Sequence, residues 1–175
     1  MNVHIRRMQQ EDIRVIHQAL ADNQMGKPLA YIERCWAEHQ SGARVTLIAL
    51  RRKQFAGWLH LLAHSNYPPF QAAGIPEINN FEVLPAYRKQ GVGKELMDAI
   101  EQIAFAQYPE VGIGVGMNAS YGQAQRLYVR RGYMPDGRGL YDGQRQVQQG
   151  DTVQVGHDLA LYLTKKRAEG KGLAP

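Results

Sequence analysis

The sequence predicts an α/β fold (α+β in some classification schemes), with a mixed sheet of about seven strands and helices on both faces. Short, largely apolar stretches of strand length recur from Val3–Met8 to Val153–Leu163. Segments with apolar residues at helical spacing, such as Val92, Leu96 and Ile100, stand between them. Strands interleaved with helices in this way build a sheet that the helices cover.

The first part of the chain predicts a strand, two helices and a hairpin. Asp12 is suited to cap the first helix, and Gly42 lies where the second should end. Both faces of the first hairpin strand are largely apolar, so we expect both to be covered. In order, these elements occupy Val3–Met8, Asp12–Leu20, Leu29–Gly42, Arg44–Leu50 and Phe55–His64.

The segment Ser65–Pro76 contains Pro68, Pro69 and Gly74, so we predict a loop there. A strand, a helix, a strand, a helix and two strands should follow. They occupy Ile78–Leu84, the segment from Val92 to Pro109, Val111–Met117, Ser120–Arg131, Tyr133–Tyr141 and Val153–Leu163. We therefore expect one domain over residues 1–164 and a basic, flexible C-terminal tail over residues 165–175.

The composition favours a soluble protein. The 175 residues are 44% hydrophobic and 21% charged, which fits one globular domain. The sequence has no apolar run of membrane-spanning length, and its N-terminus lacks the apolar stretch of a secretory signal. We therefore expect a cytoplasmic protein without membrane contact. The single cysteine, Cys35, excludes an internal disulfide and lies in a predicted helix, where it is best interpreted as a small buried hydrophobe.

The formal net charge of +5 favours anionic partners. The positive residues are spread along the chain and cluster only at Lys165–Arg167. This distribution favours a phosphate-rich cofactor over a dedicated nucleic-acid surface. A nucleic-acid binder would instead show tight, salt-sensitive binding to DNA or RNA.

The strongest local signal is the loop Arg88–Gly93, which lies between a predicted strand and a predicted helix. The first N–H groups of a helix lack intrahelical partners, and the helix dipole adds positive potential there. Gly91 and Gly93 leave room for a diphosphate, and Arg88 and Lys89 add charge. The alternative is a plain glycine turn before a helix. A Walker loop and a dinucleotide fingerprint both need glycines that this segment lacks.

The segment Val83–Met97 resembles the cofactor motif of the GCN5-related N-acetyltransferase (GNAT) family, which reads Arg or Gln, two residues, Gly, one residue, then Gly or Ala. Downstream, Asn118, Leu127-Tyr128 and Gly132-Tyr133 resemble the family's second motif. That motif usually ends in Gly-Phe, so Tyr133 is a departure. The order of the predicted elements matches the family over nearly the whole chain.

The resemblance implies a mostly antiparallel, twisted sheet and an enzyme that uses acetyl-CoA. The acetyl group would pass to a primary amine by direct attack in a ternary complex. The family's cofactor contacts carry over to Phe81, Glu82, Val83, Arg88, Lys89, Gln90, Gly91, Val92, Gly93, Lys94, Asn118 and Tyr128. For Asn118 a helix-capping role is the alternative. Gly112, Gly114 and Gly116 suit a strand that stands apart from its neighbour to admit the cofactor arm, or else mark a weak or bulged strand.

By the same resemblance, Tyr128 is the candidate general acid, because a phenol can protonate the departing thiolate. Its alternative role is packing. Glu77 is a candidate base, since histone-modifying members of the family place a glutamate at this offset. Glu82 is an alternative base, although it should lie on the opposite strand face unless a bulge intervenes. His60 and His64 are further options, and many family members use water chains.

The acceptor site is the least determined part. We expect contributions from the segment Asn23–Pro28, from Asp142 and from the aromatic residues Tyr31, Trp58, Tyr67, Phe70 and Tyr141. The aromatic residues could bind an apolar or cationic amine or else belong to the core. The acceptor would be a small molecule or a peptide, and the lack of an acidic cluster argues against a polyamine. We expect no bound metal. A non-catalytic acyl-CoA sensor on the same fold is the alternative function, which Tyr128 disfavours. Family members are often dimers, so a homodimer stays open.

Overall fold

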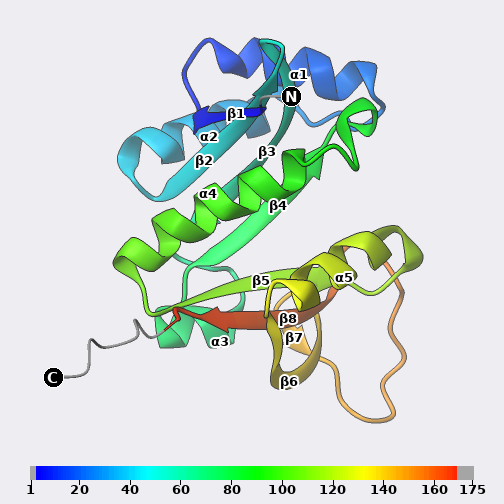
Figure 1. The fold of residues 1–175 in the computed structure, drawn as a ribbon. Helices are drawn as coiled ribbons and strands as arrows, with labels where there is room; N and C mark the ends of the chain where they lie inside the picture. Colours follow the sequence, from blue (N-terminus) through cyan, green and yellow to red (C-terminus); the bar gives the residue numbers. More distant parts are fainter. Residues whose placement is uncertain (1–2, 169–175) are drawn as a thin grey trace, which may run out of the picture.

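The computed structural model describes residues 3–168, which form one eight-stranded sheet flanked by helices (Figure 1). The strand order is β1-β2-β3-β4-β5-β8-β6-β7. Neighbouring strands are antiparallel except β4 and β5, which are parallel. The strands are β1 (Val3–Arg7), β2 (Arg44–Arg51), β3 (Gln54–Leu62), β4 (Glu77–Val83), β5 (Glu110–Gly116), β6 (Met134–Asp142), β7 (Arg145–Gln146) and β8 (Leu159–Lys166).

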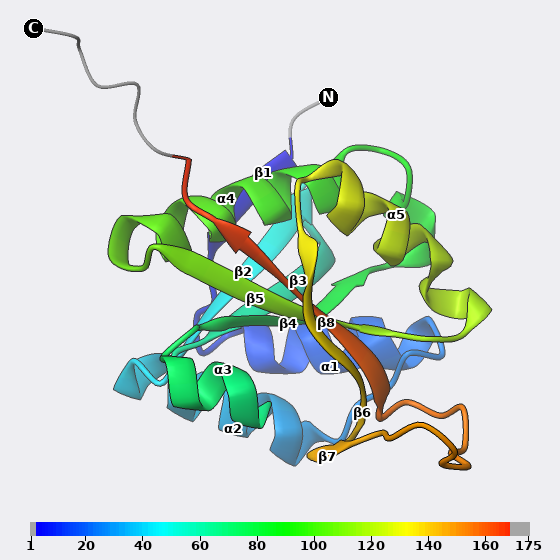
Figure 2. The ribbon, with the colours of Figure 1, turned by 90° about the horizontal axis from the view of Figure 1, so that it is seen from below.

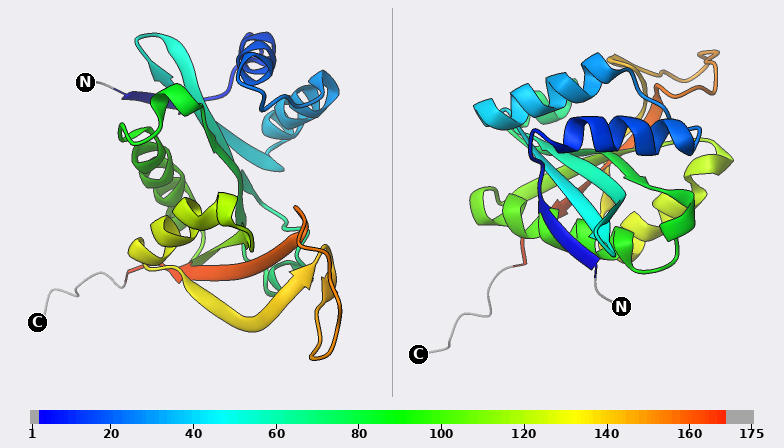
Figure 3. Two further views of the ribbon diagram at one scale, coloured as in Figure 1. Left: turned by 90° about the vertical axis from the view of Figure 1, so that its right-hand side faces the viewer. Right: turned by 90° about the horizontal axis from the view of Figure 1, so that it is seen from above.

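The helices cover both faces of the sheet, as predicted. Helices α1, α2 and α3 lie on one side, and α4 and α5 lie on the other (Figures 2 and 3). Two hydrophobic clusters fill the layers: one packs α4 and Tyr128 of α5 against the sheet, and the other packs α1 and α2 around Trp58. The helices are α1 (Asp12–Asp22), α2 (Leu29–Ser41), α3 (Pro68–Ala73), α4 (Val92–Gln107) and α5 (Gly122–Arg130). No helix among the described residues is long and apolar enough to cross a membrane.

Besides two single-turn 3₁₀ helices, Pro85–Tyr87 and Ala119–Tyr121, the structure adds a strand and a helix to the predicted set. Strand β7 is a two-residue strand in a segment for which no element was predicted, so the sheet has eight strands rather than seven. Helix α3 lies in the predicted loop, because Pro68 and Pro69 occupy its first turn, where proline needs no N–H partner. Gly74 ends this helix with φ of 65°, a left-handed conformation that glycine adopts without strain. Asp12 is the first residue of α1 rather than its cap, and its carboxylate pairs with Arg6 at 2.7 Å.

The tail was predicted to begin at residue 165, but Lys165 and Lys166 belong to the last strand. Strand β8 begins at Leu159 rather than Val153 and continues to Lys166 instead of ending at Leu163, because Lys165 and Lys166 pair with Val111 and Glu110 of β5. Lys165 Nζ also lies 2.8 Å from Glu101 Oε2. The N–H of Arg167 donates to the carbonyl of Pro109 at 2.8 Å. The rest of the predicted tail, residues 169–175, lies outside the described part of the chain.

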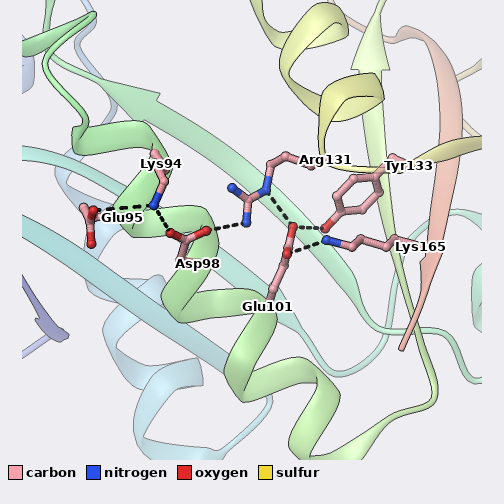
Figure 4. Close-up of polar contacts among 7 residues, drawn as sticks. All are labelled: Lys94, Glu95, Asp98, Glu101, Arg131, Tyr133 and Lys165. Atoms are coloured by element: carbon pink, nitrogen blue, oxygen red, sulfur yellow. Dashed lines mark hydrogen bonds and ion pairs between the residues drawn. The ribbon is translucent and has the colours of Figure 1, made fainter. Parts of the chain in front are cut away.

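Glu101 on α4 is the centre of a polar network that joins three elements (Figure 4). Its carboxylate accepts hydrogen bonds from Arg131 Nε at 2.8 Å, Lys165 Nζ at 2.8 Å and the Tyr133 hydroxyl at 3.1 Å. Burial acts to raise the pKa of Glu101, but the hydrogen bonds from Arg131 and Lys165 outweigh it and lower this pKa. The network holds the end of α5 against α4 and β8. It also gives a reason for Tyr133, because phenylalanine could not donate to Glu101.

Strands β4 and β5 separate soon after they start (Figure 1). They pair only at Glu77↔Gly112 and Ile78↔Ile113. Beyond Ile78 one edge of β4 has no strand partner, while its other edge stays paired with β3. In addition, β4 carries a bulge, because Trp58 pairs with Glu82 whereas His60 pairs with Asn79, which leaves one extra residue in β4.

Candidate active site

A cavity of about 520 Å³ occupies the space between β4 and β5. Residues of both strands line it, together with residues of α5 and of the segment that leads into α2. The residues that line the cavity come from both faces of the sheet. Tyr128 reaches it from the face that α4 and α5 cover, whereas Glu77 reaches it from the opposite face. The two predicted catalytic side chains therefore approach one space from opposite sides.

Tyr128 is buried to 4% exposure and packs beside Tyr133, with 6.0 Å between ring centroids. Tyr121 and Ala124 line the same cavity from the start of the helix. Burial raises the pKa of Tyr128, so the phenol carries its proton at neutral pH. A general acid must be protonated before it acts, and Tyr128 meets this condition.

Glu77 is buried, with 7% exposure, and the hydroxyl of Ser65 donates to its Oε2 atom. The same hydroxyl accepts from the N–H of Tyr67 at 2.9 Å, which fixes its direction. Burial raises the pKa of Glu77, and the hydrogen bonds from Ser65 and Asn79 offset only part of that effect. A carboxylate with a raised pKa is a stronger base than an exposed one.

Glu82 lies on the same face of β4 as Glu77, because the bulge reverses the alternation between them. Its two carboxylate oxygens are already engaged. Trp58 Nε1 donates to Oε2 at 2.7 Å, and Lys27 Nζ lies 3.2 Å from Oε1. This pairing leaves Glu82 a less available base than Glu77. It also explains why Trp58, at 0% exposure, belongs to the core.

The bulge is held by a buried chain of polar groups. Asn80 adopts a left-handed conformation with φ of 49°, and its amide Nδ2 lies 3.2 Å from His60 Nε2. His60 Nδ1 lies 2.9 Å from the hydroxyl of Thr46. Burial, aided by the charges of Arg44 and Lys27, lowers the pKa of His60 well below its usual value. His60 therefore stays neutral and positions Asn80, and it is a poor candidate for the base.

A second cavity, of about 800 Å³, adjoins the first at Phe81, Glu82 and Ala124. It lies over the start of α4, where Gly91 has φ of 86° and precedes the first helical residue, Val92. The N–H of Glu95 donates to Gly91 O at 3.0 Å, so the amides before it have no partner within the helix. A Cβ atom on Gly93 would lie 3.0 Å from the end of the Phe81 ring, so a side chain at this position would require that ring to shift.

The charge of this groove comes from the loop and from α5. Within the loop, Arg88 Nε donates to Val83 O at 3.0 Å and Gln90 Nε2 to Ala86 O at 2.6 Å, so these side chains stabilise the loop itself. Lys94 pairs with Asp98 at 2.6 Å. The basic residues that line the groove are Arg88, Lys89, Lys94, Arg126 and Arg130. With Glu82 as the single acidic lining residue, the groove suits an anion such as a diphosphate.

Sequence reasoning missed Arg126 and Arg130. Their i, i+4 spacing within the helix of the second motif puts both on one face, which is the signal that could have found them. Asn118 lines neither cavity. Its Oδ1 accepts from the backbone N–H of Ser120 at 3.0 Å, which is the capping role named above as the alternative.

The three alternating glycines of β5 make room for aromatic rings of this chain. A Cβ atom would lie 2.0 Å from the Phe70 ring at Gly112, 2.9 Å from the Tyr162 ring at Gly114 and 2.4 Å from the Tyr121 ring at Gly116. Gly114 and Gly116 also line the first cavity. The glycines thus allow the rings of Tyr121 and Tyr162 to form the cavity wall next to β5.

The aromatic residues predicted to meet the acceptor divide into two groups. Tyr31 lines the first cavity. Trp58, Tyr67, Phe70 and Tyr141 are buried in the hydrophobic clusters and do not line it. In their place, Tyr121, Tyr162 and His157 line the cavity, and the Tyr121 hydroxyl lies 2.9 Å from His157 Nδ1. His157 lies between β7 and β8, in a segment that the sequence predicted to belong to the last strand, so it was not a candidate.

Comparison with known proteins identifies the family. The model of the acetyltransferase (GNAT) family matches residues 10–133, so the chain belongs to the GNAT acetyltransferase family. No curated protein sequence matches the chain significantly. Solved structures share the fold at low identity. An N-acetyltransferase from Staphylococcus aureus Mu50 is 15% identical, with a TM-score of 0.70 over 95% of this chain and 99% of that chain.

Two further neighbours were solved with ligands. The PaiA N-acetyltransferase from Thermoplasma acidophilum, in complex with coenzyme A, is 16% identical, with a TM-score of 0.65 over 95% of this chain and 100% of that chain. The spermidine N-acetyltransferase from Vibrio cholerae, in complex with coenzyme A and spermine, is 12% identical, with a TM-score of 0.66 over 94% and 95%. At these identities the likeness establishes the fold.

The left-handed conformation of Asn80 generates a prediction about the bulge. Replacing Asn80 with Gly or with Ala removes the contact with His60, but only Ala adds left-handed strain, of about 1 kcal/mol. Asn80→Gly should therefore retain more stability in urea unfolding than Asn80→Ala. The neighbouring Asn79, which does not have a positive φ, is the control, and there Ala should be the better tolerated residue. The same order at both positions would contradict the assigned conformation of the bulge.

Proposed function

We propose that the protein transfers the acetyl group of acetyl-CoA to a primary amine, by direct attack within a ternary complex. The observation that carries this proposal is the cavity between β4 and β5. Glu77 and Tyr128 enter it from opposite faces of the sheet, and it continues into a basic groove at the start of α4. Membership of the GNAT acetyltransferase family supports the same reaction class.

The donor would lie along the two adjoining cavities. The amides of Gln90–Lys94 and the side chains of Arg126 and Arg130 would hold the phosphates of coenzyme A. The pantetheine arm would pair with the free edge of β4 at Phe81–Val83, as an added strand does. This arrangement brings the thioester to the cavity that contains Tyr128.

The acceptor would enter from the side of Glu77. An amine arrives mostly as ammonium at neutral pH and gives one proton to Glu77, directly or through a water molecule. Its nitrogen attacks the thioester carbonyl carbon, while a backbone N–H of β4 near Val83 polarises the carbonyl oxygen. The C–N bond forms, the second amine proton leaves to water, and the C–S bond breaks. Tyr128 donates its proton to the leaving sulfur and regains one from solvent, and Glu77 releases its proton to solvent. The products are therefore the amide, free coenzyme A and one proton.

A direct test of the acid is Tyr128→Phe. The variant should lower kcat by about a hundredfold, the lower range for general acid catalysis, and change acetyl-CoA affinity little. Amine-dependent thiol release gives kcat, and titration calorimetry gives the affinity. Tyr133→Phe is the matched control, since it removes a hydroxyl that bonds Glu101 outside the cavity and should cost stability rather than kcat. An unchanged kcat in Tyr128→Phe would remove Tyr128 as the acid.

Glu77→Gln should separate catalysis from stability. The pKa of Glu77 is raised by burial, so the folded state favours its protonated form, and its contribution to stability falls as pH rises through the raised pKa. Gln keeps the acceptor for Ser65 without the charge, so the variant should melt at a higher temperature than the wild type at pH 7 to 8. Its kcat/KM for an amine should fall, and this loss should shrink at alkaline pH, where the amine is already neutral. A lower Tm with unchanged kcat/KM would contradict both roles.

A further inference from the structure

Resting on the proposed transferase function, we infer that the acceptor is a primary monoamine with an uncharged, apolar or aromatic body, rather than a polyamine or an amino acid. The inference rests on the charge balance and the aromatic lining of the acceptor side of the cavity. The groups that decide it are Glu77, Glu82, Lys27 and three tyrosines.

The two carboxylates of the cavity are not equivalent. Glu82 is neutralised by Lys27 at 3.2 Å and accepts from Trp58. Glu77 is hydrogen-bonded to Ser65, and none of the ion pairs found among residues 3–168 joins it to a cation. A single carboxylate is therefore unbalanced, and it matches a single ammonium group.

A second charge on the acceptor would be unmatched or opposed. Glu77 and Glu82 are the only acidic residues among those that line the cavity, and Glu82 is already paired with Lys27, so a second ammonium group would find no unpaired carboxylate there. A carboxylate next to the reacting amine, as in an α-amino acid, would lie close to Glu77 instead. Asp158 acts electrostatically on Tyr121 and Tyr162 but is exposed and does not line the cavity, so water and salt screen it.

The remaining wall of the acceptor side is aromatic and uncharged. Tyr31, Tyr121 and Tyr162 line the cavity from three different segments, and each is only partly buried, so a ring face or edge is available to a ligand. Burial raises the pKa of Tyr31 to about 12 and that of Tyr162 to about 12, so both phenols stay neutral. Such a wall favours an apolar or aromatic body and supplies no charge for an ionic one.

The test uses pairs of amines that differ by one charged group. Butylamine is compared with 1,4-diaminobutane, and 2-phenylethylamine with phenylalanine, by acetyl-CoA-dependent thiol release. In each pair, the amine that lacks the second charged group should have a kcat/KM at least about tenfold higher than the amine that carries it. A preference for the diamine or the amino acid would overturn the inference and leave the transferase function standing. No thiol release with any amine would contradict the proposed function itself.

Two variants each remove one partner of the Lys27–Glu82 ion pair, and they should change the preference for charged amines in opposite directions. Lys27→Met frees Glu82, so the ratio of diamine to butylamine kcat/KM should rise about tenfold. Glu82→Gln frees Lys27 and keeps an acceptor for Trp58, so the ratio of phenylalanine to 2-phenylethylamine should rise instead. Lys166→Met is the control, because this exposed lysine at the far end of β8 does not line the cavity. Unchanged ratios in both folded cavity variants would overturn the inference.

Discussion

The separation of β4 from β5 beyond Ile78 is the constraint on which the rest of the site depends. A continuous sheet would occupy this space with backbone hydrogen bonds and would block passage between the two faces. Because the strands part, one edge of β4 is free and a cavity connects the α5 side with the α2 side. The proposed donor and acceptor can then meet at one point while each arrives from its own face.

Three sets of contacts stabilise the arrangement of β4, β5 and α5 around the cavity. The aromatic rings of Phe70, Tyr162 and Tyr121 pack directly over the glycines of β5. On β4, Asn80 and His60 hold the bulge that turns Glu82 to the same side as Glu77. The ion-pair network around Glu101 fixes α5, and with it Tyr128, against α4 and β8 (Figure 4). These contacts lie outside the proposed reaction but set the positions of its groups.

Much of the donor half could be predicted from the sequence, because its signals are local. The loop Arg88–Gly93 and the helix after it follow from glycine, charge and helical spacing within a short segment, and the structure places a basic groove there. The acceptor half depends on contacts between residues far apart in sequence. The pairing of Lys27 with Glu82, the burial of Trp58 and the place of His157 in the cavity wall arise only when distant segments meet. The bulge in β4 likewise has no signature in the sequence beyond Asn80, a residue type that tolerates the left-handed conformation.

The central claim is that the acetyl-CoA arm lies along the free edge of β4. Hydrogen–deuterium exchange with and without acetyl-CoA tests it most directly, because an added strand protects the backbone amides with which it pairs. The account predicts slower exchange in peptides that cover Phe81–Val83 as well as in those that cover Gln90–Lys94, with β1 unchanged. Protection confined to Gln90–Lys94, or none in either segment, would contradict it.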